Sequence, residues 1–397
     1  MLTLRQALAL ALQRNPELAS AAWEVRAGEA RTLQAGLLPN PEVGVEVENF
    51  AGSGEFRSVD AAETTIALSQ VIELGGKRLR RARLAALERD LTAWDYEATR
   101  IDVFTATTKA FVDVLSAQAQ LALSEDLVRL AERVLSTVAA RVQAGQVSPV
   151  EETRARVALS TSRIALERAG RELGATRERL AATWGSTAPA FERGEGALER
   201  IVPIPSADRL AQRIRQNPDI ARWIAEMAQR QAAVALEEAR RIPNVTGTGG
   251  VRRLRETRDT ALIMQLSIPL AVFDRNQGAI LEARYQLARA GEERRAAEVR
   301  VLTELAATYA ELSSAFVEAT TLQAEVLPGA QSAFEAFSEG YRQGKFGFLD
   351  VLDAQRTLFE ARGRYIEALT AYHRAVTEME RLVGEPLEAG TAPPVPH

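Results

Sequence analysis

The feature that most constrains this chain is a stretch of 68 residues, from Lys77 to Ala144, without a glycine or a proline. Both residue types interrupt helices, so their absence permits one continuous helix on the order of 100 Å long. Its apolar residues recur every three or four positions, which predicts a coiled-coil seam. The residues of this seam are Leu84, Leu87, Leu91, Trp94, Ala98 and Ile101.

The composition favours long helices and excludes several classes of function. The 49 Lys and Arg nearly balance the 53 Asp and Glu, without a long basic run, so we expect no nucleic-acid partner. With no cysteine and two histidines, the chain cannot form a thiolate or multi-histidine metal site by itself. Gly75-Gly76-Lys77 lacks the upstream glycine of a phosphate-binding loop. We therefore expect no enzyme activity, no cofactor and no metal site.

The cellular location stays open at the level of composition. No run of about 18 apolar residues is present, so no helix is expected to span a bilayer. No signal peptide follows Met1, which fits either a cytosolic protein or an exported chain whose leader has been removed.

The chain repeats itself at about half its length. Four pairs of short motifs recur in the same order at offsets between 199 and 204 residues. They are Asn15-Pro16 and Asn217-Pro218, Leu38-Pro39-Asn40 and Ile242-Pro243-Asn244, Gly145 and Gly344, and Ala155 and Ala354.

These repeats predict the organisation of the domains. We expect a first repeat over residues 1–184 with a long helical hairpin at 76–184, and a second over 206–384 with a hairpin at 275–384. A Pro- and Gly-rich linker at 185–205 joins them, and a flexible tail follows at 385–397. We expect interruptions of the second hairpin at Gly291 and Pro328, with a kink at the proline.

Four short segments alternate apolar and polar residues, which predicts β-strands. The segments are about 42–49, 64–73, 244–253 and 260–269. In the first of them, valines alternate with Glu46 and Glu48.

Two interpretations of these strands remain open. They could form two ordinary hairpins on a soluble coiled-coil scaffold, or they could cross a membrane, since 9–11 residues suffice for a tilted strand. Membrane strands must close into a barrel, which several chains with four strands each can do. The second interpretation predicts an oligomeric barrel whose lumen is lined by Glu46 and Glu48, continued by a coiled-coil conduit.

Three longer motifs carry a resemblance to a known family. They are Leu38-Pro39-Asn40-Pro41-Glu42, the run Leu-Ser-Gln-Val-Ile-Glu-Leu-Gly-Gly-Lys-Arg from residue 68 to 78, and Tyr341-x-x-Gly344 followed by Asp350-Val351-Leu352-Asp353-Ala354. Together they resemble the TolC-like outer-membrane factors, and most of all their heavy-metal CzcC/CusC-like branch.

This resemblance implies a mainly α fold with a small β part. Three identical chains would form a twelve-stranded transmembrane β-barrel and an α-helical barrel, in a Gram-negative outer membrane and extending into the periplasm. The implied function is a passive exit duct for heavy-metal cations in a tripartite efflux system. Its partners would be outer-membrane lipid, a periplasmic adaptor and an inner-membrane transporter of the RND type. Export of organic drugs or solutes, or type I secretion, is the alternative.

The resemblance also assigns roles to residues at the predicted hairpin tips. Asp350 and Asp353 would narrow the closed entrance, and their i, i+3 spacing places both carboxylates on one side of a helix. Three copies around an axis would concentrate negative charge, as in acidic rings of cation channels. Tyr341 and Glu151 would hold the tips closed. The residues expected to contact the adaptor are Gly145, Ser148, Gly344 and Gly347.

Overall fold

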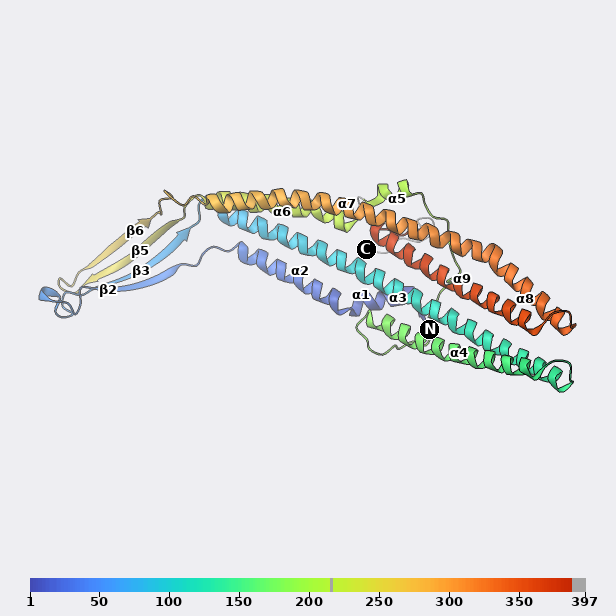
Figure 1. Ribbon diagram of the computed structural model, residues 1–397. Helices are drawn as coiled ribbons and strands as arrows, with labels where there is room; N and C mark the ends of the chain where they lie inside the picture. The colour runs from blue at the N-terminus through green and yellow to red at the C-terminus, as the bar shows by residue number, and fades with distance from the viewer. Residues whose placement is uncertain (215–216, 388–397) are drawn as a thin grey trace. The chain divides into compact units, whose positions relative to one another are not determined.

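A computed structural model describes residues 1–214 and 217–387 of this mainly helical chain (Figure 1). The contacts divide the chain into two compact units. Unit 1 comprises the described parts of 1–21, 96–220 and 298–397, and unit 2 comprises 22–95 and 221–297. Each unit takes residues from both predicted repeats, so the repeat division stays a prediction. Most of the predicted flexible tail lies outside the described residues.

The helices of the described residues include the long ones that the sequence predicts. They are α1 (Leu4–Arg14), α2 (Pro16–Ala35), α3 (Lys77–Gln143), α4 (Pro149–Ala182), α5 (Ala207–Arg213), α6 (Pro218–Arg240), α7 (Gln277–Thr321), α8 (Leu327–Arg342) and α9 (Phe348–Val383). Helix α3 alone has 67 residues, and its seam residues Leu87 and Leu91 are buried.

The interruption of the long helix in the second repeat differs in part from the prediction. Gly291 lies inside α7 and does not interrupt it, so this expectation was wrong. A π-helical turn at Leu322–Val326 separates α7 from α8 and ends two residues before Pro328, where the second interruption is predicted. Proline lacks the N–H group that an α-helix needs, and a widened turn accommodates the missing hydrogen bond.

Unit 1 is held together by packing and ion pairs between α3 and α9. Arg374 pairs with Asp113 at 2.6 Å, and Arg381 pairs with Asp102 at 2.7 Å. Beside them, Met379 of α9 is fully buried in a cluster formed with α5 and α7. Apolar burial supplies the stability of such a core, and the charged pairs orient the two helices.

The predicted linker is tied to the helices of unit 1. Its strand β4 (Gly194–Glu195) pairs in parallel with β1 (Leu2–Thr3). Leu198 is buried against α3 and α9, and its carbonyl oxygen lies 2.7 Å from Nε2 of His373. This histidine therefore has a partner in the fold, and the linker segment is ordered by packing.

The strands of unit 2 form one four-stranded antiparallel sheet. They are β2 (Glu42–Glu48), β3 (Glu63–Ile72), β5 (Val245–Leu254) and β6 (Thr260–Ser267), in the spatial order β2-β3-β5-β6. Figure 1 shows the two hairpins side by side, joined through β3 and β5. Strands that long helices separate in the sequence thus pair into one sheet within a single chain. Strands β2 and β6 form the open edges of this sheet.

The two faces of the sheet differ in chemistry. The register places Val45, Ile66, Val251 and Leu262 in one row, and each of these side chains is at least 42% exposed. The next row toward the helices, Val43, Leu68, Gly249 and Met264, continues this apolar face, whereas the row toward the loops combines Val47 with Thr64, Arg253 and Thr260. The opposite face carries glutamate, threonine, serine, arginine and small side chains, because side chains alternate along each strand.

The repeated Asn-Pro motif has the same structural role in both halves. Oδ1 of Asn15 accepts a hydrogen bond from the N–H of Leu18, and its Nδ2 donates to the carbonyl of Thr183, both at 2.8 Å. Asn217 is buried and likewise donates to the carbonyl of Leu382 at 2.7 Å. Each amide thus caps a helix start and binds the end of a distant helix.

Replacing either asparagine by alanine is expected to lower the free energy of unfolding by about 1–3 kcal/mol, because a cap and a buried partner are lost together. Asn→Asp at 15 or 217 keeps the capping oxygen but sets a carboxylate oxygen against the carbonyl of Thr183 or Leu382, so the loss should be at least as large at neutral pH. Thermal unfolding of the purified protein measures both. Asn40→Ala is the control, because Asn40 is exposed. Equal stability of the Asn217 and Asn40 variants would contradict the bridging role of the Asn217 amide.

Candidate functional site

The two hairpin turns of unit 1 are built by glycines with a left-handed backbone. Gly145 has φ 70° and Gly344 has φ 75°, the left-handed conformation that favours glycine after the last turn of a helix. Ser148 then caps α4 by accepting from the N–H of Val150 at 3.3 Å. Gly347 stands at the N-cap of α9. The four predicted tip residues therefore define both turns, and contact with an adaptor remains a prediction for them.

Tyr341 and Glu151 contact each other between the two hairpins. The phenol of Tyr341 donates a hydrogen bond to Oε2 of Glu151 at 3.0 Å, and the tyrosine is buried. Burial first, and then the hydrogen bond and negative charge of Glu151, raise the pKa of Tyr341 to about 12. The structure thus brings together two residues that are 190 positions apart in sequence.

Arg141 is a third member of this contact that sequence reasoning missed. Its guanidinium donates to the carbonyl oxygen of Tyr341 at 2.8 Å and lies 4.4 Å from the centre of the tyrosine ring. Both interactions hold α3 against α8. Its place one turn before Gly145 was the available signal, since basic side chains favour the last turn of a helix.

Asp350 and Asp353 are exposed on one side of the first turns of α9. Oδ2 of Asp350 accepts from the N–H of Gly347 at 2.9 Å, so this carboxylate also caps the helix. Asp353 pairs with Arg356 at 2.6 Å, and both side chains are more than two-thirds exposed. An ion pair this exposed is weak, so the carboxylate of Asp353 stays accessible to cations.

The polar face of the sheet contains a charged cluster that includes Glu48, one of the two acids predicted to line the lumen. Arg252 pairs with Glu48 at 3.2 Å and with Glu63 at 3.0 Å, and it donates to Oγ1 of Thr65 at 3.0 Å. Glu46 lies opposite Thr65 on the same face. Sequence reasoning missed Arg252, although it alternates with Gly250 and Thr248 along β5.

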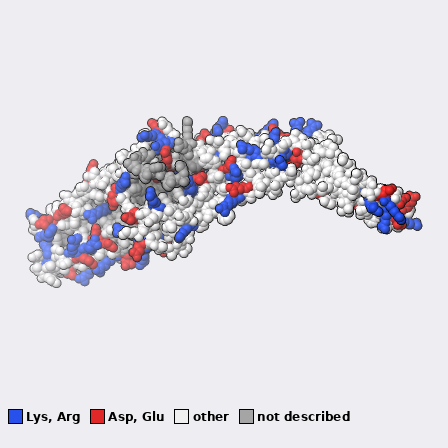
Figure 2. Space-filling model, turned by 180° about the vertical axis from the view of Figure 1, so that it is seen from behind, with Lys and Arg blue, Asp and Glu red and all other residues white. Residues whose placement is uncertain are grey.

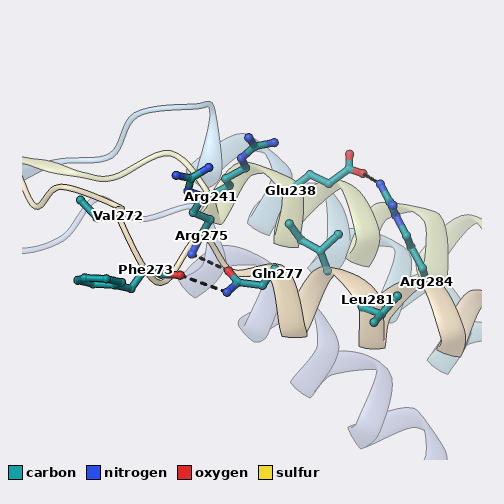
Figure 3. A pocket seen from close by; sticks show the side chains of 9 residues that line it. Glu238, Arg241, Val272, Phe273, Arg275, Gln277, Leu281 and Arg284 are labelled. Carbon is teal, nitrogen blue, oxygen red and sulfur yellow. Dashed lines mark hydrogen bonds and ion pairs between the residues drawn. The ribbon is translucent and has the colours of Figure 1, made fainter.

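A basic pocket lies in unit 2 where the sheet continues into the helices (Figure 3). Glu238 of α6 pairs with Arg284 of α7 at 2.8 Å, which leaves Arg241 and Arg275 to give the pocket its positive charge. Next to them, Phe273 is 91% exposed. The pocket therefore combines cationic and aromatic side chains at one end of the apolar sheet face.

None of the described helices combines the length and hydropathy needed to span a membrane. Within the same residues, no group of three His, Asp or Glu side chains could hold a metal ion.

Nearly the whole chain is similar to known proteins of one family. The family described as "outer membrane efflux protein" matches residues 7–186 and 210–385. The cobalt-zinc-cadmium resistance protein CzcC of Cupriavidus metallidurans is 36% identical over 383 residues, which cover 96% of this chain and 90% of that protein. The pyoverdine export outer membrane protein OpmQ of Pseudomonas putida is 25% identical over 411 residues, with 96% and 85% covered.

Solved structures show the same fold at low sequence identity. CusC, whose crystal structures concern folding and transmembrane channel formation, superposes with a TM-score of 0.82 at 18% identity, and 96% of this chain and 92% of CusC are covered. The predicted resemblance to the CzcC/CusC-like proteins is thereby confirmed.

The contact between Tyr341 and Glu151 makes a pH-dependent prediction. Below pH 10, the ordinary pKa of tyrosine, the phenol is protonated in folded and unfolded chains, and the contact stabilises the tips fully. Between pH 10 and about 12 the unfolded form ionises first, so this stabilisation is lost as the pH rises. Tyrosinate absorbance should include a component with a pKa near 12 that Tyr341→Phe removes.

Glu151→Gln should lower the pKa of Tyr341, because the negative charge is gone while burial remains. Glu152→Gln is the control, since Glu152 pairs with the exposed Arg156 instead. An unchanged titration in the Glu151 variant would show that the two side chains are not in contact.

Proposed function

We propose a function from one premise: this chain belongs to the outer membrane efflux protein family. We infer that it forms the outer-membrane channel of an efflux system, located in the outer membrane and extending into the periplasm. Such a channel conducts its substrate passively, which is a transport role and not a catalytic one.

The observation that carries this proposal is the two-faced sheet. An apolar face of exposed valine, isoleucine, leucine and methionine side chains suits contact with lipid hydrocarbon, and the polar face suits a water-filled lumen. Strand β5 has 10 residues and so extends about 33 Å. When tilted, that length matches the apolar band of about 25 Å found in outer-membrane barrels.

The open edges of the sheet support closure by other copies. Within a membrane every backbone N–H and C=O group needs a partner, and β2 and β6 each leave one side unpaired. Pairing β6 of one copy with β2 of the next satisfies both edges. Three copies give the twelve-stranded barrel that the family resemblance predicts, and four strands are too few to enclose a lumen.

The tips of unit 1 are proposed as the gate and the adaptor contact. Tyr341, Glu151 and Arg141 join the two hairpins of one chain, so their release would allow the tips to separate. The turns at Gly145 and Gly344 are proposed to contact a periplasmic adaptor, which in turn would connect to an RND transporter. Asp350 and Asp353 would form the acidic constriction.

The proposed substrates are heavy-metal cations. The support is the name of CzcC, a cobalt-zinc-cadmium resistance protein, at 36% identity. Organic solutes are the second candidate, because OpmQ is named for pyoverdine export. The two substrate classes are separated by measuring accumulation in cells with and without this chain. The measurement compares zinc, cobalt and cadmium with an organic siderophore.

The barrel proposal is tested by a matched pair of substitutions on β6. Met264 is 94% exposed on the apolar face, and Gln265 points to the polar face. Met264→Lys should destabilise the inserted protein by about 2–4 kcal/mol, because a charge meets hydrocarbon, whereas Gln265→Lys should be tolerated in the lumen. The measurement is the amount of outer-membrane protein that runs unboiled at about three times 43.3 kDa.

Equal amounts of this band from both variants would overturn the assignment of the faces. A soluble monomer from an exported wild-type chain would overturn the barrel itself and favour a scaffold.

The gate is tested by removing charge without changing shape. Asp350→Asn with Asp353→Asn should reduce block by polyvalent cations in planar bilayers, raising the half-blocking concentration about tenfold or more. Asparagine at 350 keeps an oxygen for the cap on Gly347. Glu360→Gln is the matched control, because Glu360 also lies near Arg356 but is further from the tip. An unchanged half-blocking concentration in the double variant would exclude the two aspartates from the constriction.

A further inference from the structure

Three arginines lie at the loop end of the sheet without an acidic partner. Arg253 is near the end of β5, and Arg255 and Arg258 are in the turn that leads to β6; all three are exposed. They line one pocket together with Val47 and Ile66. Within the part of the chain that the structure describes, none of the three forms an ion pair.

The neighbouring Arg252 shows how this chain neutralises an arginine on its polar face. Arg252 has two carboxylates, those of Glu48 and Glu63, within 3.2 Å. Arg253 is the next residue and therefore points to the opposite, apolar face, where the register places Val47 and Thr64 beside it. With this face in contact with lipid, as proposed above, the guanidinium of Arg253 is removed from water and takes its counterion from outside the described part of the chain.

Acidic side chains are present in the nearby loops, but they do not line the pocket. Figure 2 shows both signs of charge gathered at the loop end of the sheet. The acids are Glu55, Asp60, Glu256 and Asp259. The carboxylate of Asp60 accepts a hydrogen bond from Oγ of Ser58 at 2.5 Å. The pocket itself is lined by basic, apolar and threonine side chains.

The floor of the pocket continues into the apolar face. Val251 and Ile66 belong both to the pocket and to the row that includes Val45 and Leu262. Phe50, also in the lining, is 52% exposed. A basic rim over an apolar floor matches an amphiphile with an anionic head and a hydrocarbon chain, because the guanidinium group binds phosphate oxygens in pairs.

We propose that this pocket binds the phosphate group of a phosphorylated glycolipid, with the acyl chains lying along the apolar face. The inference rests on the proposed function, which puts that face in the membrane. The loops 49–62 and 255–259 lie at the end of the sheet opposite the starts of α3 and α7, so the lipid is one of the outer leaflet. The apolar floor selects a lipid over free phosphate.

The test uses the full chain purified in detergent, with lipid A as the probe. The variant Arg253→Gln/Arg255→Gln/Arg258→Gln should bind lipid A on the order of 100-fold more weakly, since each arginine near an anionic lipid surface contributes about fivefold to the affinity. Dephosphorylated lipid A should bind the wild-type chain as weakly as intact lipid A binds the triple variant. The control Arg168→Gln/Arg171→Gln removes two exposed arginines from α4, outside the sheet, and should keep wild-type affinity.

Three outcomes would overturn the proposal: equal affinity of the triple variant and the wild type, an equal loss in the control, or inorganic phosphate binding as tightly as lipid A. If the triple variant does not fold, lipid A binding by Arg258→Gln alone tests the proposal. The salt dependence of wild-type binding tests it as well, because contacts with phosphate weaken as salt is added. The unboiled trimer band and conductance of the same preparations test the proposed function separately. A conducting trimer with unchanged lipid binding would overturn only the lipid inference.

Discussion

The pairing of β3 with β5 is the interaction on which the rest of unit 2 depends. It joins two hairpins from opposite halves of the chain, and its register sets which side chains share a face. The two backbones approach closely at Gly250, where a Cβ atom would overlap the carbonyl oxygen of Ile66 and lie 2.8 Å from Cα of Ala67. Glycine is therefore required there, and the register is fixed sterically as well as by hydrogen bonds. Both faces, the two open edges and the arginines at the loop end follow from this register.

The sequence could predict the elements of the fold because their patterns are local. A stretch without glycine or proline predicts α3, and alternation predicts the strands within a few residues. The joining of the hairpins could not be predicted, because it depends on contacts between residues such as Ser69 and Thr248, 179 positions apart, with no local signal. Gly291 was misjudged for a related reason: an isolated glycine weakens a helix by only about 1 kcal/mol, which packing in a long helix can offset.

Residues of the candidate site could be predicted where they belong to a sequence motif. They could not be predicted where their role depends on contacts with residues far away in the sequence. Tyr341 and Glu151 were assigned through the family resemblance, and the structure brings them into contact. Arg141 and Arg252 were missed because their importance comes from partners across the fold. Asp350 has a further role as a helix cap, which local spacing from Gly347 could have suggested. The sequence thus predicts the fold and the family more completely than it predicts the role of each carboxylate.

The paired asparagines impose an order on folding. Asn15 reaches a carbonyl 168 residues away and Asn217 one that is 165 residues away, while the hairpins of the sheet meet across a similar separation. Closing a loop of that length costs about 4–5 kcal/mol of chain entropy before any contact compensates for it. Residues near 250 must therefore be available before the first half can complete its sheet. Such a high contact order makes for slow folding, during which the first two strands stay exposed, so the chain depends on protection from aggregation until β5 and β6 have joined them.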